Sequence, residues 1–301
     1  MSTSTAQEAR PELSKARVRG DHPIRSFLRR FSRNRLAVFG AVVIGLMILI
    51  ALLAPLIAPY GPNAQDYEAS LQNESFRHPM GADLSGRDQL SRIIYGARIS
   101  VQASLYAVGI ALLIGVPVGL LTGYYRGFWD EWVVMRIVDT LQAFPFLILA
   151  LALAATLGGG FGKAMIAIGI GFSPGFIRIV RAQVMTVSGQ EFVQAAKSTG
   201  VKDFRILTRH ILPNSMAPLL VQTTLAMGSA ILAEAALSFL GLGVQPPTPS
   251  WGKMLAESKD YLNVAPHLAY WPGLGIFLAV LGFNLMGDGV REALDPRIGH
   301  R

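Results

Sequence analysis

Side chains that could carry out chemistry are few in this chain, and most of them stand alone. No cysteine is present, which excludes disulfides, thiolate metal sites and cysteine nucleophiles. The five histidines have no i, i+4 spacing and no flanking glutamate that would form a metal site; they are His22, His78, His210, His267 and His300. We therefore expect structural or solvent-exposed roles for them, and no catalytic residue or metal site in this chain.

One glycine-rich stretch, "LGGGFGKA" at 157–164, superficially suggests a phosphate-binding loop. A Walker A loop needs glycine at the first position and serine or threonine at the last. This chain has Leu157 and Ala164 there. The stretch is interpreted as a turn at a membrane edge, and we expect no cofactor in the chain.

Three polar residues lie inside long apolar windows, namely Asp139, Gln142 and Glu234. Such groups are costly in a bilayer unless they face protein or a water-filled cavity. They are candidates for the lining or gate of a transport pathway. Buried structural hydrogen bonding is the alternative.

A polar, basic segment, "QAAKSTGVKDFRILTRHILPN" at 194–214, lies between two apolar windows. Ala195 and Ala196 give a predicted first helix a thin face that another protein could approach closely, and Gly200 is suited to end that helix in a left-handed cap. A second helix would follow, with Phe204 on its apolar side, until Pro213. The pattern favours a docking element on the membrane surface over a merely amphipathic loop.

The elements that position these residues are predicted to be membrane-spanning helices. The chain has 301 residues, of which 51% are hydrophobic, and its mean hydropathy is +0.41. A bilayer core about 30 Å thick needs roughly 20 apolar residues in a helix. Six windows meet or approach this length, at 36–59, 99–123, 133–157, 164–180, 217–242 and 268–287. We therefore predict an all-α integral membrane protein with about six spans.

The lysines and arginines indicate the orientation of these spans. With a cytoplasmic N-terminus, 20 of the 27 bases fall on the inside, which predicts that both termini and residues 190–213 are cytoplasmic. The net charge of +8 is then explained by this sorting and by anionic lipid, so we expect no nucleic-acid partner.

Three regions are predicted along the chain. Residues 1–35 form a basic cytoplasmic segment, residues 36–96 an anchoring span with an extracytoplasmic loop, and residues 97–301 a five-span block. Within that block Gly115, Gly119 and Gly123 repeat at a spacing of four and so line one helix face. This face predicts a close helix contact, either inside the chain or with a partner.

The polar segment resembles the EAA loop of ABC importer permeases, whose pattern is E-A-A, three residues, G, nine residues and I-x-L-P. The chain has Gln194, Ala195, Ala196, Gly200 and then His210-Ile211-Leu212-Pro213, departing at Gln194 and His210. "HPMGADLSGRDQLSRIIYGARIS", "MRIVDTLQAFPFLILAL", "AEAALSFLGLGVQPPTPSWGKML" and "FNLMGDGVREALDPR" resemble further segments of the dipeptide, oligopeptide and nickel branch of that family.

This resemblance implies a type I importer fold and the second, C-type, permease subunit in the bacterial inner membrane. Its implied partners are a homologous permease, two cytoplasmic ATPases that bind the ATP, and an extracytoplasmic solute-binding protein. Coupling to the ATPases is carried over to Gln194, Ala195, Ala196, Gly200 and Pro213.

The ligand stays open, since similar permeases handle peptides, nickel chelates, glutathione and other small solutes. Two other classes of protein are the alternatives. An ion channel would need a pore-lining ring or filter, and a membrane-embedded enzyme would need clustered catalytic groups. The sequence shows a charged loop and sparse intramembrane polar residues instead.

Overall fold

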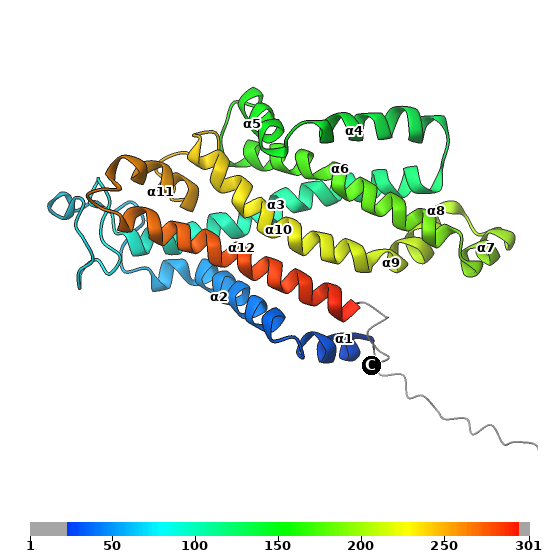
Figure 1. Cartoon of the computed structure of the whole chain (residues 1–301), viewed down its shortest axis with the longest axis horizontal. Helices are drawn as coiled ribbons and strands as arrows, with labels where there is room; N and C mark the ends of the chain where they lie inside the picture. The colour runs from blue at the N-terminus through cyan, green and yellow to red at the C-terminus, as the bar shows by residue number, and fades with distance from the viewer. Residues whose placement is uncertain (1–22, 295–301) are drawn as a thin grey trace, which may run out of the picture.

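The computed structural model describes residues 23–294, and within that range it contains helices, turns and two isolated β-bridges but no strand. The helices form one elongated bundle (Figure 1). Five of them are long and apolar enough to cross a membrane: α2 (Arg35–Ile57), α3 (Gln89–Tyr124), α6 (Phe161–Ser188), α10 (Met216–Phe239) and α12 (His267–Leu294). The predicted all-α membrane fold is confirmed, while residues 1–22 of the predicted basic segment lie outside the described range.

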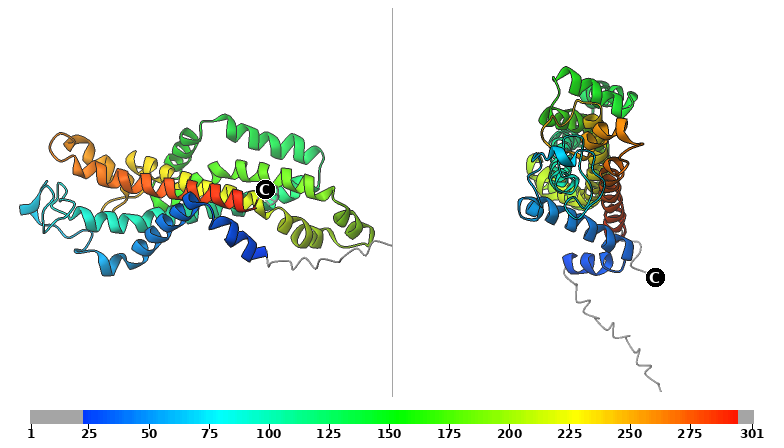
Figure 2. Two further views of the ribbon diagram at one scale, coloured as in Figure 1. Left: turned by 60° about the horizontal axis from the view of Figure 1, so that its bottom comes forward. Right: turned by 90° about the vertical axis from the view of Figure 1, so that its left-hand side faces the viewer.

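Shorter helices connect and flank the spans. They are α1 (Pro23–Phe31), η1 (Tyr67–Ala69), η2 (Trp129–Val134), α4 (Met135–Ala143), α5 (Phe146–Thr156), α7 (Glu191–Ser198), α8 (Asp203–Ile206), η3 (Leu207–Ile211), α9 (Leu212–Asn214), α11 (Trp251–Ser258) and η4 (Lys259–Tyr261). Helices α7 to α9 gather at one end of the long axis, which we call the coupling end. Helix α11 and the loop of residues 58–88 gather at the opposite end, the cap end (Figure 2).

The third predicted span, 133–157, is not a straight helix. The helical segment Trp129–Ala143 and helix α5 are bent by 99° relative to each other. The residue before a proline is disfavoured in helical conformation, and Phe144, which precedes Pro145, has an extended backbone with ψ of 138°. The segment is therefore a broken span or a re-entrant loop, and it counts as a sixth crossing only if the two pieces form one span.

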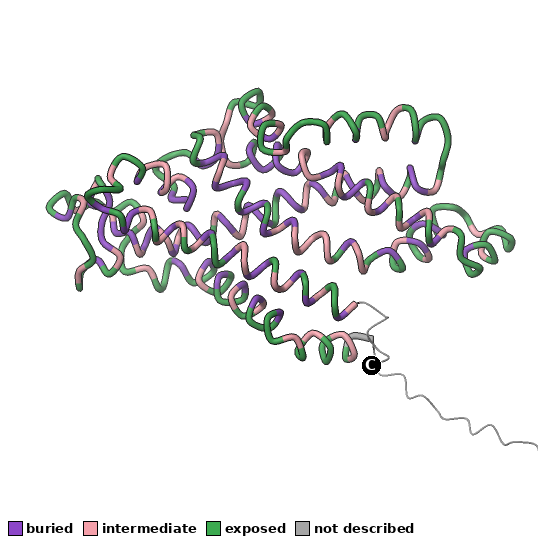
Figure 3. The backbone as a smooth tube through the Cα atoms, viewed as in Figure 1, coloured by how far each residue is buried: buried purple, intermediate pink, exposed green. Residues whose placement is uncertain are grey.

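The glycine face of α3 packs against α6 within the same chain. A Cβ atom at Gly119 would lie 2.7 Å from the Cβ of Val180, and one at Gly123 would lie 2.7 Å from the Cβ of Val184. Small residues at this spacing let two helix backbones approach closely. The contact left open by the sequence is thus internal, and it forms the centre of the buried core (Figure 3).

Helix α6 extends to Ser188, past the end of the predicted fourth span at residue 180. Arg178 and Arg181, which the charge count assigned to a cytoplasmic loop, therefore lie inside a helix. Their charges are satisfied by acidic partners on the α4 side of the bundle, as described below.

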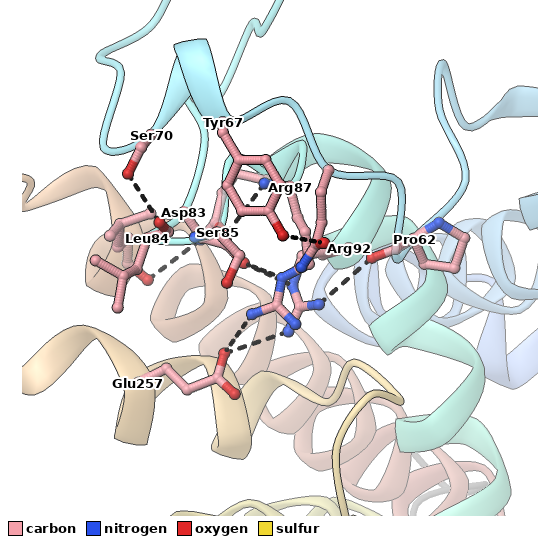
Figure 4. A network of polar contacts seen from close by, with 12 residues as sticks. Pro62, Tyr67, Ser70, Asp83, Leu84, Ser85, Arg87, Arg92 and Glu257 are labelled. Atoms are coloured by element: carbon pink, nitrogen blue, oxygen red, sulfur yellow. Dashed lines mark hydrogen bonds and ion pairs between the residues drawn. The ribbon is translucent and has the colours of Figure 1, made fainter.

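A network of charges holds the cap end together (Figure 4). Arg92, only 1% exposed, contacts Glu257 at 3.3 Å and Asp83 at 3.5 Å. Arg87 contacts the same two carboxylates, at 3.2 Å and 2.6 Å respectively. Since Asp83 lies in the loop, Arg92 on α3 and Glu257 on α11, the network joins three segments far apart in sequence. Helix α3 begins at Gln89, within the predicted loop, because the carboxylate of Asp88 caps its first turn.

Candidate functional site

The turn at the coupling end closes α7 in the predicted way. Gly200 has a φ of +74°, and its N–H donates to the carbonyl of Lys197 while the N–H of Val201 donates to that of Ala196. These two bonds form a Schellman motif, in which glycine is favoured because it adopts the left-handed conformation without strain. No atom lies within 4 Å of where a Cβ of Gly200 would be, so the turn projects into open space.

The second helix of this element is continuous from α8 through a π-helical turn, η3, into α9. Ile206, Leu207 and Ile211 are buried against the bundle. Phe204, which was assigned to the same apolar side, is instead 77% exposed. An exposed aromatic ring at this tip supplies apolar area that a partner could cover.

The two alanines of α7 do not share one outer face. Ala195 is exposed, whereas Ala196 is half-buried and packs against the core of its own chain. Gln194 donates through Nε2 to the carbonyl of Ser188, 2.8 Å away, and so contacts the end of α6. Pro213 lies in α9 at the entry to α10. A large side chain at the exposed Ala195 would therefore not disturb the core, whereas one at Ala196 would.

Two hollows lie along α4 and α6, and we call them together the α4–α6 groove; both have mainly apolar linings that include a few polar side chains. A hollow of about 620 Å³ is lined by Gln142 together with Gln222 and Ser229 of α10. A neighbouring hollow of about 530 Å³, at earlier positions of α4 and later positions of α6, contains Asp139 and Arg178. The structure thus places Gln142 and Asp139, two of the three predicted polar residues, in two hollows along α4 and α6.

Asp139 and Arg178 form an ion pair at 2.5 Å, with side chains that are 53% and 50% exposed. A charged pair within the spans is costly if it faces lipid. The exposed face of this pair is therefore better suited to protein, water or lipid headgroups than to the hydrocarbon of the bilayer.

A second ion pair was not predicted from the sequence. Arg181 donates to both carboxylate oxygens of Asp130, at 2.9 Å and 2.6 Å, and Asp130 is only 2% exposed. The sequence feature that could have indicated it is the pair of arginines three residues apart in "RIVR" at 178–181. It was missed because these residues were assigned to a loop.

Glu234 lies apart from the groove. It is fully buried in α10, and its Oε1 accepts a 2.6 Å hydrogen bond from Ser238. The hydroxyl of Ser238 in turn accepts a 2.9 Å bond from the N–H of Val244. Glu234 thus ties α10 to the turn that leads to α11, and its predicted pathway or gate role stays a prediction.

The bundle, its broken span and its projecting helical pair define the fold of an importer permease. Solved structures of the inward-facing MetNI methionine ABC transporter align with this chain at TM-scores of 0.56 and 0.54, with 18% and 17% sequence identity. The first alignment covers 67% of this chain and 96% of the other, and the second covers 68% and 97%. At this identity the likeness shows the fold.

Sequence comparison shows the family. Residues 115–300 match the binding-protein-dependent transport system inner membrane component, and residues 22–74 match the N-terminal transmembrane domain of oligopeptide transport permease C. The chain belongs to this family of ABC importer permeases and is a multi-pass membrane protein of its C-type branch.

Curated relatives match nearly the whole chain. The dipeptide transport system permease protein of Alkalihalophilus pseudofirmus is 46% identical over 276 residues, covering 92% of this chain and 90% of its own length. The glutathione transport system permease protein of an Escherichia coli strain is 45% identical over 277 residues, covering 92% and 91%. Membership implies in general terms a partner permease, ATPase subunits and a binding protein.

Proposed function

We propose that this chain is the C-type permease of an importer for di- or oligopeptides, that it performs no bond chemistry itself, and that both its termini are cytoplasmic. A homologous permease would complete the translocation pathway, a solute-binding protein would deliver the ligand at the cap end, and two cytoplasmic ATPases would drive transport. The 46% identical relative carries dipeptide transport in its name, which favours a short peptide as ligand. Glutathione is the second candidate, since a 45% identical relative is named for it.

The observation that carries the coupling proposal is the projecting pair of helices α7 and α8. Its turn reaches open space, and it exposes Ala195 together with the ring of Phe204 at the end of the bundle opposite the cap. Small and apolar groups at a projecting tip fit a groove on a soluble partner. Coupling would then use Gln194, Ala195, Ala196, Gly200 and Pro213 as the segment that docks and holds its shape.

Ala195→Trp tests this coupling role. Overpacking a tight contact costs about 1–3 kcal/mol, so ATPase affinity should fall about 5- to 150-fold. We expect ATPase retention and ligand-stimulated ATP hydrolysis to fall together in nanodiscs that hold the whole transporter. Arg126→Trp, at another exposed position, is the matched control and should retain the ATPases. Normal retention and normal stimulated hydrolysis in Ala195→Trp would contradict the coupling role.

The groove between α4 and α6 is the proposed pathway surface, with Asp139 and Gln142 lining it. Because the chain has no cysteine, Gln142→Cys introduces a single thiol. We expect a water-soluble thiol reagent to modify it in inverted vesicles at some stage of the transport cycle. Leu113→Cys, on the exposed side of α3, is the lipid-facing control and should stay unmodified. If Gln142→Cys and Leu113→Cys were equally protected from the thiol reagent throughout turnover, Gln142 would not line the pathway.

Uptake into proteoliposomes identifies the ligand. A dipeptide and glutathione, each supplied with the binding protein and ATP, would be compared directly. Accumulation of the dipeptide supports the proposal, and accumulation of glutathione alone supports the second candidate.

A further inference from the structure

Four side chains from three helices meet where α3 ends beside the coupling helices. The hydroxyl of Tyr124 donates to Oδ1 of Asp203 at 2.7 Å, and the hydroxyl of Tyr125 donates to Oδ2 at 2.9 Å. The Lys197 ammonium lies 4.7 Å from the centre of the Tyr124 ring, within the range of a cation–π contact. We call the two tyrosines and the aspartate the tyrosine–aspartate clasp.

The clasp is electrostatically suited to stay closed at cytoplasmic pH. The Tyr124 hydroxyl, followed by that of Tyr125, holds the pKa of Asp203 below its ordinary value. The carboxylate is therefore ionised at neutral pH and accepts two charge-assisted bonds, which are stronger than neutral ones. Its two oxygens are bound by two consecutive residues, so the carboxylate is fixed in orientation as well as in position.

The clasp links the coupling helices α7–α9 to α3, a helix that does not adjoin them in the sequence. Along the chain, α7 follows α6, and the α8–α9 segment leads into α10. Helix α3 instead continues into η2 and α4, so its contact with α8 is made across space. Asp203 is the first residue of α8, directly after the Gly200 turn.

Movement that the clasp transmits to α3 would also move α6. Gly119 and Gly123 hold α3 against α6 with no room for a Cβ atom. Closely packed helices of this kind move as a unit rather than deforming continuously. Movement of the α7–α8 pair would therefore shift α3 and α6 together, and α6 carries Arg178, which lines the α4–α6 groove.

We infer that Tyr124, Tyr125 and Asp203 are positioning residues that transmit ATPase-driven movement of the coupling helices to α3. This inference rests on the proposed coupling function, and it adds a second connection to the covalent ones through α6 and α10.

The experiment uses the complete transporter in proteoliposomes and measures three quantities: retained ATPase, ligand-stimulated ATP hydrolysis, and ligand imported per ATP hydrolysed. Asp203→Asn removes the charge from the clasp, and the double variant Tyr124→Phe/Tyr125→Phe removes both of its hydroxyl donors, each with little change in size. We expect both to retain the ATPases and to hydrolyse ATP. Import per ATP should fall by at least about fivefold, the lower end for coupling between sites.

Three further variants separate transmission from a general structural effect. The triple variant Asp203→Asn/Tyr124→Phe/Tyr125→Phe should import no less ligand per ATP than Asp203→Asn or the tyrosine double variant, because the effects of groups that act as one unit are not additive. Asp203→Glu keeps the carboxylate and should recover part of the import ratio. Tyr106→Phe makes the same chemical change on α3 at an exposed position away from Asp203, and it should behave like the wild type.

The outcomes distinguish the inference from the proposed function. If the clasp variants lose the ATPases together with hydrolysis, these residues belong to the docking surface and the inference is overturned while the coupling function stands. An unchanged import ratio in both clasp variants also overturns it. A wild-type complex that neither retains ATPases nor imports a peptide would overturn the proposed function as well.

Discussion

Glu74 shows how a single side chain fixes the loop of residues 58–88. Its carboxylate accepts hydrogen bonds from the hydroxyl of Tyr270 and from the indole N–H of Trp271, the latter at 3.1 Å, both at the start of α12. These bonds, that from Tyr270 first, lower the pKa of Glu74 from its ordinary value of 4.5. A carboxyl whose pKa is lower in the folded state stabilises that state above its unfolded pKa and loses the effect as the pH falls through the folded one.

The loop around Glu74 should therefore loosen only in acid, below pH 4.5. Hydrogen exchange, corrected for intrinsic rates, should rise in residues 71–78 as the pH falls through that window. Glu74→Gln should show raised exchange already at neutral pH, with little further rise on acidification. Glu68→Gln, an exposed position in the same loop, serves as the control. Identical pH profiles for the wild type and Glu74→Gln would show that the contact does not hold the loop.

Glu234 makes a different kind of contact, because it is buried and bonded within its own chain. Glu234→Gln keeps the shape and one acceptor oxygen, so assembly should be retained while import is reduced. Glu234→Leu removes the link to Ser238 and should reduce import further. Comparison of complex yield with import rate checks both variants. Wild-type import by an assembled Glu234→Leu complex would leave the residue without a pathway or gating role.

The α7–α8 turn is an element whose shape depends on one backbone angle. Gly200 adopts a φ of +74° in open space, so an alanine there meets no atom but strains the backbone. A left-handed conformation costs roughly 1–2 kcal/mol for a residue with a Cβ. Gly200→Ala should therefore weaken ATPase binding by at least about fivefold, and Gly200→Val by more.

Titration of the ATPase against nanodisc-embedded permease measures the affinity of each Gly200 variant. Gly109→Ala, at a glycine of α3 that also has free space around it, is the control and should bind normally. Normal affinity for Gly200→Val would mean that the ATPase does not depend on this turn.

The sequence predicted elements well where one physical signal dominates. Apolar length located the spans α2, α3, α6, α10 and α12, and glycine chemistry located the end of α7. It failed where tertiary geometry decides. The break at Pro145 lies inside an apolar window, and nothing local to the sequence sets its angle.

The sequence predicted which polar residues are unusual but not their partners, again because tertiary geometry decides. A carboxylate in an apolar window, such as Asp139 or Glu234, is conspicuous in sequence, but its partner is chosen by the packing of another helix. Asp130 and Arg181 were missed because the predicted end of the fourth span placed Arg181 in a loop. Ala196 was misplaced on the outer face because the exact rotation of a two-turn helix depends on what it packs against.

At the scale of the whole molecule, the coupling and cap ends lie at opposite ends of the bundle (Figure 1). The charge distribution predicts that the coupling end faces the cytoplasm. A thiol at Ser198 should therefore react with an impermeant reagent only in inverted vesicles, and one at Asn73 only in intact cells. Both positions are exposed, so accessibility does not bias the comparison. Labelling of Ser198→Cys from outside intact cells would show that the topology is the reverse of the predicted one.

The α3–α6 contact also governs which sequence changes the chain can tolerate. A Cβ at Gly119 would lie 2.8 Å from the carbonyl oxygen of Ile177, and one at Gly123 would lie 2.8 Å from that of Arg181. Since these obstacles are backbone atoms, no smaller side chain on α6 can compensate for a larger one on α3. In a library of single variants selected for import, positions 119 and 123 should accept only glycine, while the exposed Leu113 and Leu121 of the same helix should accept any apolar residue.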